Sequence, residues 1–284
     1  MEHLQALGVS IASEQAPHEL YKASPTYNKL LSLPDTEPES RILIVDNDTA
    51  LLGDLGALAD YSADTAYLSV ADKVRISKEL WQELVSQLNI PVIQEDWIAW
   101  FDRFESTKNG KQPRVNRNLY FNSGVLLLPR GSGAVRVGRL WNEYSRKLSE
   151  YCNQRDYAQR QTLGSDQASL SMAIADYRQF GHLPLAYHYR PPHFWYGDLE
   201  GDHISVFHAF GNRPVFDPLP RKDKWVLNKI VDAYFDNFVN QHCPEGDSRR
   251  IASDIVRDKI NSAISDCACN DIARWWRAAV NDDS

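Results

Sequence analysis

The stretch Ile42-Leu43-Ile44-Val45-Asp46-Asn47-Asp48 decides the fold class. Its four apolar, mostly β-branched residues predict a strand buried on both faces, as in parallel α/β sheets. Asp46 and Asp48 follow at the carboxyl end of this strand, which is the edge where open α/β sheets bind ligands. Two such carboxylates can share one hard cation, Mg²⁺ or Mn²⁺, which in turn holds substrate phosphates. The alternative is that Asp46-Asn47-Asp48 is ordinary turn chemistry after a strand.

Two further polar segments lie beside apolar runs. Asn122-Ser123-Gly124 leads into a second buried strand. Gly124 lets the backbone pass close to a ligand or a neighbouring chain, and the side chains of Asn122 and Ser123 can hydrogen-bond sugar hydroxyls. Asp166-Gln167 stands where a helix is predicted to begin, so Asp166 is either a site carboxylate or a residue that stabilises the helix N-terminus.

The last polar segment follows a short strand predicted over residues 204–208. This strand ends in His208, and Gly211 and Arg213 come soon after it. A histidine at a strand end can be a third metal ligand, and a nearby glycine and arginine can form a turn that binds phosphate.

Taken in order, these segments resemble the family 8 glycosyltransferases, which are retaining nucleotide-sugar enzymes with a GT-A fold. The resemblance extends from position 28 to position 214. Its motifs stand here as Asn28-Lys29-Leu30, Asp46-Asn47-Asp48, Phe121-Asn122-Ser123-Gly124-Val125, Asp166-Gln167 and His208-Ala209-Phe210-Gly211. The family's basic residue after the last motif is a lysine, whereas here it is Arg213, one position earlier, and the family's tryptophan is missing.

The resemblance implies an α/β protein with a GT-A fold: a mixed, mostly parallel sheet flanked by helices, with a helical carboxyl-terminal tail. It implies a hexosyltransferase that moves a sugar from UDP to a hydroxyl of a glycan, a lipid-linked sugar or a protein. It assigns Mn²⁺ or Mg²⁺ to Asp46, Asp48 and His208, and catalysis to Asp166 and Asn122. The donor contacts that it implies are Lys29, Asn47, Ser123, Gly124, Gln167, Gly211 and Arg213.

The resemblance also predicts how the chain is divided. Residues 1–220 form the expected GT-A-like domain, and residues 221–284 form a helical extension. Ile42 comes early compared with family members, so the amino-terminal nucleotide-binding strands are expected to be incomplete. That feature keeps a second hypothesis open, a catalytically inactive binding or scaffold protein with this fold. A nucleotidyltransferase ranks last, because no glycine-rich basic phosphate loop stands near the amino terminus.

Composition excludes other classes of function. A net charge of −7 argues against nucleic-acid binding, which needs clustered lysine and arginine. Four scattered cysteines are typical of a reducing cytosol, and the spacing of Cys267 and Cys269 fits no common zinc finger. No apolar run approaches about 18 residues, so we expect no transmembrane segment and a cytoplasmic protein. A homo-oligomer stays possible, since a partner chain could complete the edge of the sheet.

Apolar periodicity predicts helices over 80–88, 135–151 and 248–264. The stretch 181–203 is rich in proline and aromatic residues and is predicted to be a loop. Its aromatic side chains could stack on an acceptor sugar, but a packed aromatic loop is the favoured interpretation.

Overall fold

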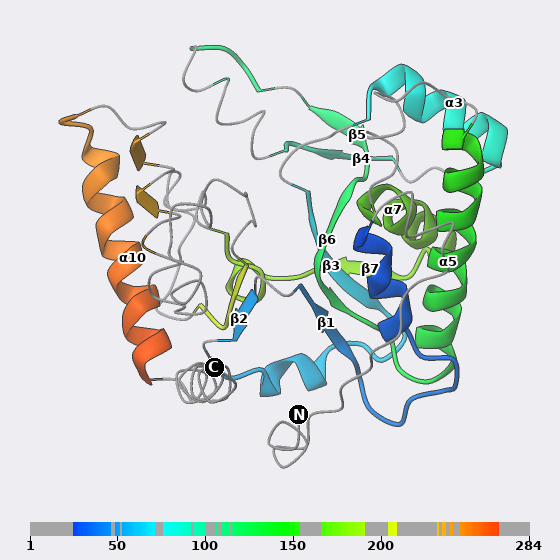
Figure 1. Ribbon diagram of the computed structural model, residues 1–284, viewed down its shortest axis with the longest axis horizontal. Coiled ribbons are helices and arrows are strands. Elements are labelled where there is room, and N and C mark those ends of the chain that lie inside the picture. Colours follow the sequence, from blue (N-terminus) through cyan, green and yellow to red (C-terminus); the bar gives the residue numbers. More distant parts are fainter. Residues whose placement is uncertain are drawn as a thin grey trace, which may run out of the picture.

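A four-stranded mixed sheet lies at the centre of the protein (Figure 1). The computed structural model describes residues 25–46, 49–51, 53–71, 76–91, 94–99, 106, 110–113, 115–153, 166–190, 204–208, 232, 235–236, 239–240 and 245–266. The strands of the sheet, in spatial order, are β1 (Leu43–Val45), β6 (Phe121–Leu127), β3 (Ala66–Val70) and β7 (Phe180–His182). β6 runs antiparallel to β1 and β3, while β3 and β7 are parallel. The carboxyl ends of β1, β3 and β7 therefore lie at the same edge as the amino end of β6.

The interior strand β6 is buried along its whole length. Val125 and Leu127 pack in one apolar cluster, and Leu126 and Leu128 pack in another, larger one. This alternation follows from the period of two in a strand, and it explains why the sequence here is continuously apolar.

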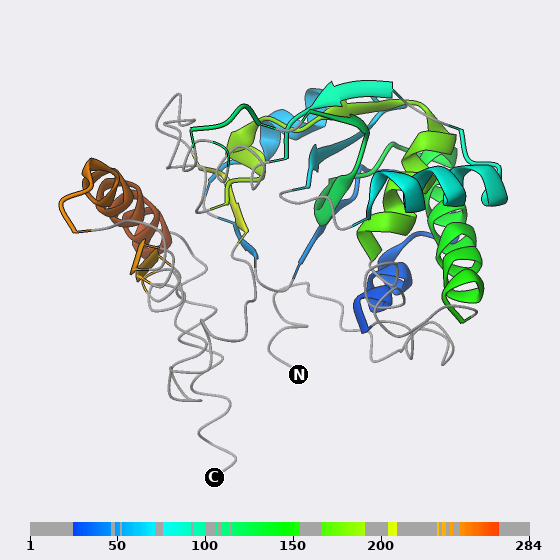
Figure 2. The ribbon, with the colours of Figure 1, turned by 90° about the horizontal axis from the view of Figure 1, so that it is seen from above.

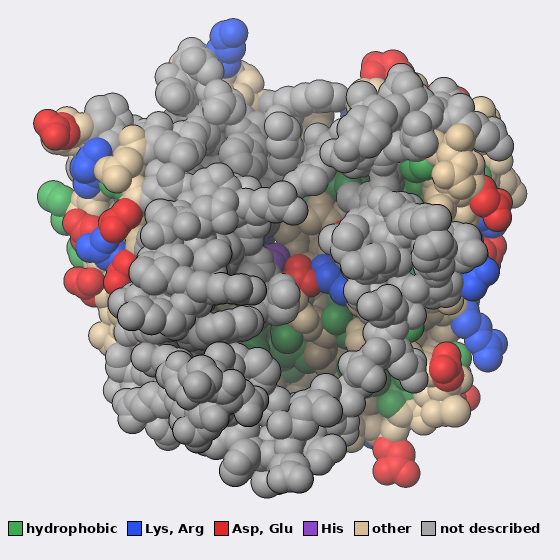
Figure 3. Space-filling model, in the orientation of Figure 1, with side chains coloured by type: hydrophobic (Ala, Val, Ile, Leu, Met, Phe, Trp, Pro, Cys, Tyr) green, Lys and Arg blue, Asp and Glu red, His purple; other side chains and the backbone are tan. Residues whose placement is uncertain are grey.

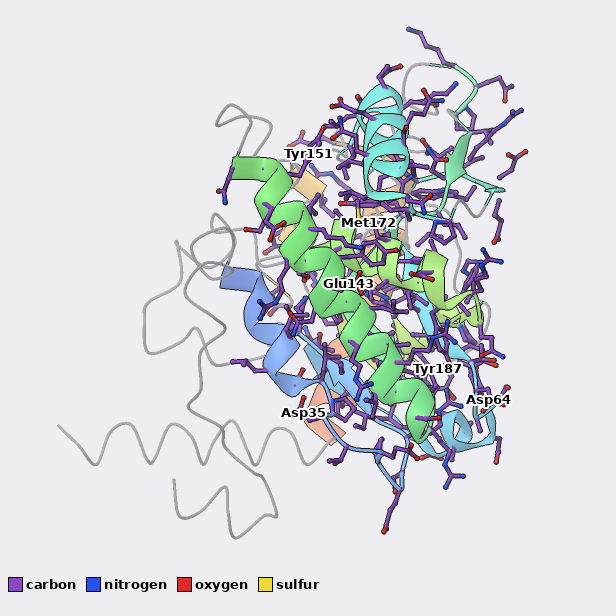
Figure 4. The ribbon with its side chains drawn as sticks, turned by 90° about the vertical axis from the view of Figure 1, so that its right-hand side faces the viewer. Asp35, Asp64, Glu143, Tyr151, Met172 and Tyr187 are labelled. Carbon is purple, nitrogen blue, oxygen red and sulfur yellow. The ribbon has the colours of Figure 1, made fainter. Side chains whose placement is uncertain are left out.

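Helices cover one face of the sheet (Figure 2). α7 (Asp166–Tyr177) packs between β6 and α5 (Ser132–Asn153), and η1 (Pro25–Ser32) lies against α5 (Figure 4). Ten of the twelve residues of α7 are buried, including Ser169 and Ser171, as expected of a helix enclosed on nearly every side. The larger core cluster lies between these helices and the sheet, and α3 (Lys78–Leu88) adds Trp81 and Leu84 to it.

Smaller elements complete the described part of the chain. β2 (Thr49–Leu51) pairs antiparallel with β8 (Val206–His208), which places Thr49 opposite His208. The other elements are β4 (Gln94–Trp97), β5 (Asn116–Asn118), η2 (Gly56–Asp60), η3 (Leu185–Tyr187) and α10 (Ser248–Asp266).

Arg41 ties the start of β1 to the start of β3. Its guanidinium group donates hydrogen bonds to the carbonyl oxygens of Tyr61 at 2.7 Å, Ser62 at 2.8 Å and Thr65 at 2.9 Å. The same group lies over the ring of Tyr67, 5.5 Å from its centre. Charge-assisted hydrogen bonds are stronger than neutral ones, so this contact fixes where β1 enters the sheet.

Most of the predicted architecture is confirmed. The fold is α/β with a mixed sheet flanked by helices, as predicted, although two of the three strand pairings in the four-stranded sheet are antiparallel, whereas a mostly parallel sheet was predicted. The helices expected over 135–151 and 248–264 are α5 and α10. α3 begins after Ser77, whose side chain accepts a hydrogen bond from the Leu80 N–H, and ends at Asn89 in the left-handed conformation. Within the described residues, no helix is both long and apolar enough to cross a membrane.

Two predictions about local structure are wrong. β1 is not buried on both faces, because it lies at the edge of the described four-stranded sheet and leaves Val45 36% exposed. The stretch 181–203 is not entirely loop, because Gly181 and His182 pair with β3 and η3 follows them. Residues 191–203 and the predicted domain boundary at 220 lie outside the described residues.

Candidate active site

Side chains from segments far apart in the sequence meet at the edge of the sheet where β1 ends and β6 begins. Figure 3 shows a histidine, an acidic and a basic side chain next to one another in a hollow near the centre of this face. The residues that converge here are Lys29 from η1, Asp46 after β1, Ser123 in β6, Asp166 at the start of α7 and His208 at the end of β8.

Lys29 is the centre of the arrangement. Its ammonium group lies 2.5 Å from Asp46 Oδ1 and 2.9 Å from Asp166 Oδ2. It also donates to the hydroxyl of Ser123 at 3.1 Å and to the carbonyl of the same residue at 3.3 Å. Lys29 thus joins two carboxylates that the sequence separates by more than a hundred positions.

Asp46 divides its two oxygens between two partners. While Oδ1 contacts Lys29, Oδ2 lies 3.6 Å from His208 Nε2. The backbone of Asp46 is fixed as well, because its N–H donates to the Gly124 carbonyl at 2.9 Å. One carboxylate therefore faces a cation on one side and an imidazole nitrogen on the other.

Gly124 makes room for His208. A Cβ atom at position 124 would lie 2.0 Å from His208 Cε1, 2.5 Å from Nδ1 and 2.7 Å from Nε2. Real side chains never approach so closely, so the histidine ring lies directly on the backbone of β6 at the only residue type that permits it. The sequence predicted that a ligand or a neighbouring chain would pass close to the backbone at Gly124, and in the structure the His208 side chain does so.

His208 is held from behind by a second histidine. His188 Nε2 lies 2.9 Å from His208 Nδ1, and the two rings stack with centres 5.1 Å apart. The exposed fractions of the two residues are 0% for His188 and 3% for His208. His208 therefore presents Nε2 to Asp46 and Nδ1 to His188.

Hydrogen bonds from β6 and α5 fix the start of α7, where Asp166 lies. Ser123 Oγ donates to Asp166 Oδ2 at 2.6 Å. The indole N–H of Trp141 in α5 donates to the Asp166 carbonyl at 3.2 Å and to Ser169 Oγ at 3.1 Å. Asp166 is buried and stands in the first turn of the helix, where the dipole favours a negative charge. Both functions proposed for it from the sequence, helix-start residue and site carboxylate, are compatible with this placement.

The ionisation of the cluster favours charged Lys29 and charged Asp46. Burial acts to lower the pKa of Lys29, but the carboxylates of Asp166 and Asp46 outweigh it and raise that pKa above its ordinary value. Burial acts to raise the pKa of Asp46, but the His208 ring and the Lys29 ammonium outweigh it and lower that pKa.

The described residues supply part of a metal site. Atoms that both bind one metal at 2.0–2.2 Å lie at most about 4.4 Å apart, so the 3.6 Å between Asp46 Oδ2 and His208 Nε2 fits a shared ion. The described ranges contain no cluster of three His, Cys, Asp or Glu side chains that could hold a metal. The third predicted ligand, Asp48, lies outside them. The donor set present, a carboxylate and an imidazole, suits Mn²⁺ or a similar divalent ion.

The predicted residues fall into three groups. The structure brings together Lys29, Asp46, Ser123, Gly124, Asp166 and His208. Asn122 lies beside them and accepts a hydrogen bond from the Gly124 N–H at 2.7 Å, while the described contact of Gln167 is made by its backbone carbonyl. The predicted residues outside the described ranges are Asn47, Asp48, Gly211 and Arg213.

His188 was missed by the sequence analysis. It stands in an aromatic stretch that has no periodicity and no recognised motif. A backbone contact brings it to the site: Tyr189 N–H donates to the Val206 carbonyl at 2.9 Å, and His208 N–H donates to the Tyr189 carbonyl at 2.8 Å. The favoured interpretation of packed aromatic residues fits Tyr189, which is fully buried.

Comparison with known proteins identifies the family. The profile of the Rhodobacterales glycosyltransferase domain matches residues 1–178. The chain belongs to this family. The glycosyltransferase resemblance expected from the motifs is thereby confirmed. A comparison with curated proteins gave no match. Among solved structures, galactosyltransferase LgtC in complex with donor and acceptor sugar analogues is similar, with a TM-score of 0.40 and 14% identity over 83% of this chain and 74% of that one.

The two partly buried ion pairs of Lys29 predict a distinctive pH dependence of stability. In metal-free protein, Lys29→Met removes the cation between Asp46 and Asp166 and should cost about 3 kcal/mol of unfolding free energy. Because the pKa of Asp46 is lowered, its contribution is complete above the ordinary value of 3.8 and is lost as pH falls through the folded-state pKa. Because the pKa of Lys29 is raised, its contribution is complete below 10.5 and is lost as pH rises through the folded-state pKa.

Urea unfolding of wild type and Lys29→Met in chelator tests this prediction. The difference in unfolding free energy should be constant from roughly pH 5 to pH 9, shrink as the pH falls below 3.8, and shrink again as the pH rises above 10.5. A difference that changes between about pH 6 and 7 would instead implicate a histidine and contradict the assignment.

Proposed function

We propose that this glycosyltransferase transfers a hexose from a UDP-sugar to a hydroxyl acceptor with retention of configuration, and that it uses Mn²⁺ or Mg²⁺. The supporting observation is the convergence of Lys29, Asp46, Asp166 and His208 at one edge of the sheet. The acceptor is a glycan, a lipid-linked sugar or a protein. The few cysteines of the chain support a location in the cytoplasm.

Asp46 and His208 are the proposed metal ligands within the described residues, with Asp48 as the third. A divalent ion bound there supplies Lewis-acid stabilisation of the leaving diphosphate. Support comes from the distance of 3.6 Å between Asp46 Oδ2 and His208 Nε2 and from Gly124, which leaves room for the His208 ring. Lys29 adds a fixed positive charge beside this point, and Arg213 is a second proposed diphosphate contact.

The other polar residues are proposed to bind the sugar. Lys29 and Ser123 both contact Asp166 Oδ2, so this carboxylate is held at a fixed position by two donors. Within the described residues the amide nitrogen of Asn122 has no hydrogen-bond partner, although the residue is only 1% exposed. A buried donor without a partner is costly, and a sugar hydroxyl would satisfy it. Asn47, Gly124, Gln167 and Gly211 are the remaining proposed donor contacts.

In the proposed reaction the bond between the anomeric carbon and the diphosphate oxygen breaks, and its electron pair leaves with UDP. The acceptor oxygen forms the new bond on the same face, and its proton passes to the departing diphosphate. Positive charge develops on the sugar ring between these events. Asp166, which accepts hydrogen bonds from Lys29 and Ser123, is proposed to stabilise that charge or to orient the acceptor.

Titration of the full chain with UDP by calorimetry, with and without Mn²⁺, tests the proposal. We expect binding that requires the metal, followed by release of UDP when UDP-glucose or UDP-galactose is supplied with an acceptor. Metal-dependent UDP binding without transfer or hydrolysis of any UDP-sugar would support a nucleotide-sensing role instead of catalysis. Absence of UDP binding in both conditions would contradict the proposal and favour the alternative, an inactive binding or scaffold protein that kept the fold and lost the donor site.

A further inference from the structure

The stacked pair of His188 and His208 has one hydrogen bond that determines the chemistry of the exposed nitrogen. The bond joins His188 Nε2 and His208 Nδ1 at 2.9 Å, so one of these atoms donates and the other accepts. Both rings are buried, so breaking the hydrogen bond between these two nitrogens would be costly. The direction of this bond therefore decides which nitrogen of His208 carries its proton.

A metal can bind His208 only through a lone pair on Nε2, the atom that faces Asp46. The proton of neutral His208 must then reside on Nδ1, and Nδ1–H must donate to His188 Nε2. His188 in turn must accept at Nε2 and carry its own proton on the buried Nδ1, for which the described residues supply no hydrogen-bond acceptor. Partners of this kind orient ligand rings and raise their basicity in many metal sites, although most are carboxylates or carbonyls.

The backbone holds His188 firmly enough for this role. It follows η3, and its N–H donates to the Leu185 carbonyl at 3.0 Å. The next residue, Tyr189, bridges β8 through two backbone hydrogen bonds, so the two histidines are attached to neighbouring backbone segments. These backbone hydrogen bonds fix the separation of the two main-chain segments from which the rings of His188 and His208 meet.

We propose that His188 is a positioning residue that fixes the tautomer and the orientation of His208 for metal binding. This proposal rests on the proposed function, because it requires a divalent ion at Asp46 and His208. His188 contacts neither the ion nor the sugar; it acts through the His208 ring. The site thus includes a residue from the aromatic stretch after β7.

Two substitutions separate the hydrogen bond from ring stacking. His188→Phe keeps a flat ring at 188 but offers no acceptor to His208 Nδ1–H. His188→Gln loses the ring but places an amide oxygen as many bonds from Cβ as the original Nε2. His182→Phe is the matched control, because His182 is exposed and contacts Glu95 at 3.0 Å instead of the site.

The affinity of each protein for Mn²⁺, measured from the electron paramagnetic resonance signal of free Mn²⁺, is the first readout. His188→Phe should weaken binding about 10- to 100-fold, His188→Gln should recover most of the loss, and His182→Phe should bind like wild type. Unfolding in chelator shows whether each variant is folded. Wild-type affinity in a folded His188→Phe overturns the proposal, as does greater loss in His188→Gln than in His188→Phe.

The tautomer is the second readout, and a merely structural role would not change it. Long-range proton–nitrogen NMR spectra of ¹⁵N-histidine-labelled wild type with saturating Mg²⁺ should place the His208 proton on Nδ1. A proton on Nε2 overturns the proposal even where metal affinity depends on His188. Wild type that binds neither Mn²⁺ nor Mg²⁺ overturns the proposed function as well, which distinguishes that failure from failure of the His188 proposal alone.

Discussion

Asp46→Asn should lower the rate of sugar transfer about a thousandfold and abolish its dependence on Mn²⁺. The asparagine keeps the shape of the side chain but removes the charge that faces both Lys29 and His208. A divalent ion contributes several kcal/mol to stabilising the leaving diphosphate, and each 1.36 kcal/mol corresponds to a factor of ten in rate. Initial rates of UDP release, measured against Mn²⁺ concentration, provide the test.

The design of this experiment separates catalysis from folding. In Asp46→Asn, Lys29 keeps its contacts with Asp166 and Ser123, so the folded state should survive. Asp60→Asn is the control, since Asp60 lies exposed in η2 and loses the same charge. Equal rates for wild type and a folded Asp46→Asn would refute a metal-binding role for Asp46.

Gly124→Ala should destabilise the protein by about 2 kcal/mol and weaken Mn²⁺ binding at least tenfold. The added Cβ would lie 2.0 Å from His208 Cε1, so either β6 or the ring has to shift. The ring has little freedom to do so, because it is buried against His188 and belongs to the paired strand β8. Chemical unfolding and Mn²⁺ titration measure the two effects separately.

A double-mutant cycle shows whether the clash with His208 is the cause. His208→Ala removes the ring, so Gly124→Ala should cost much less stability in that background than in wild type. Gly138→Ala in α5 is the matched control, because its new Cβ would come no closer than 3.3 Å to Leu33. Equal costs of Gly124→Ala in both backgrounds would exclude the His208 clash as the source of destabilisation.

The site was predictable from the sequence to the extent that its residues follow strands or begin helices. Asp46 and His208 each stand where an apolar run of β-forming residues ends, and Asp166 stands where an apolar helix begins. Such positions meet at the edge of a sheet, so the grouping of these side chains could be foreseen.

Other features depend on contacts that no local pattern encodes. The exposure of Val45 depends on the position of β1 at the edge of the described sheet. An apolar run in the sequence does not show whether its strand lies at an edge or in the interior. His188 reaches His208 only because Tyr189 pairs with the backbone of β8. Nothing in the aromatic stretch around His188 indicates that pairing.

By itself the sequence determined the α/β class, the main helices and most residues of the candidate site, because apolar periodicity and helix and strand ends are local properties. Only the tertiary structure decided that Lys29 lies between Asp46 and Asp166, that Gly124 accommodates the His208 ring, and that His188 supports that ring. These contacts join distant segments, and their distances depend on how the helices and strands pack against one another.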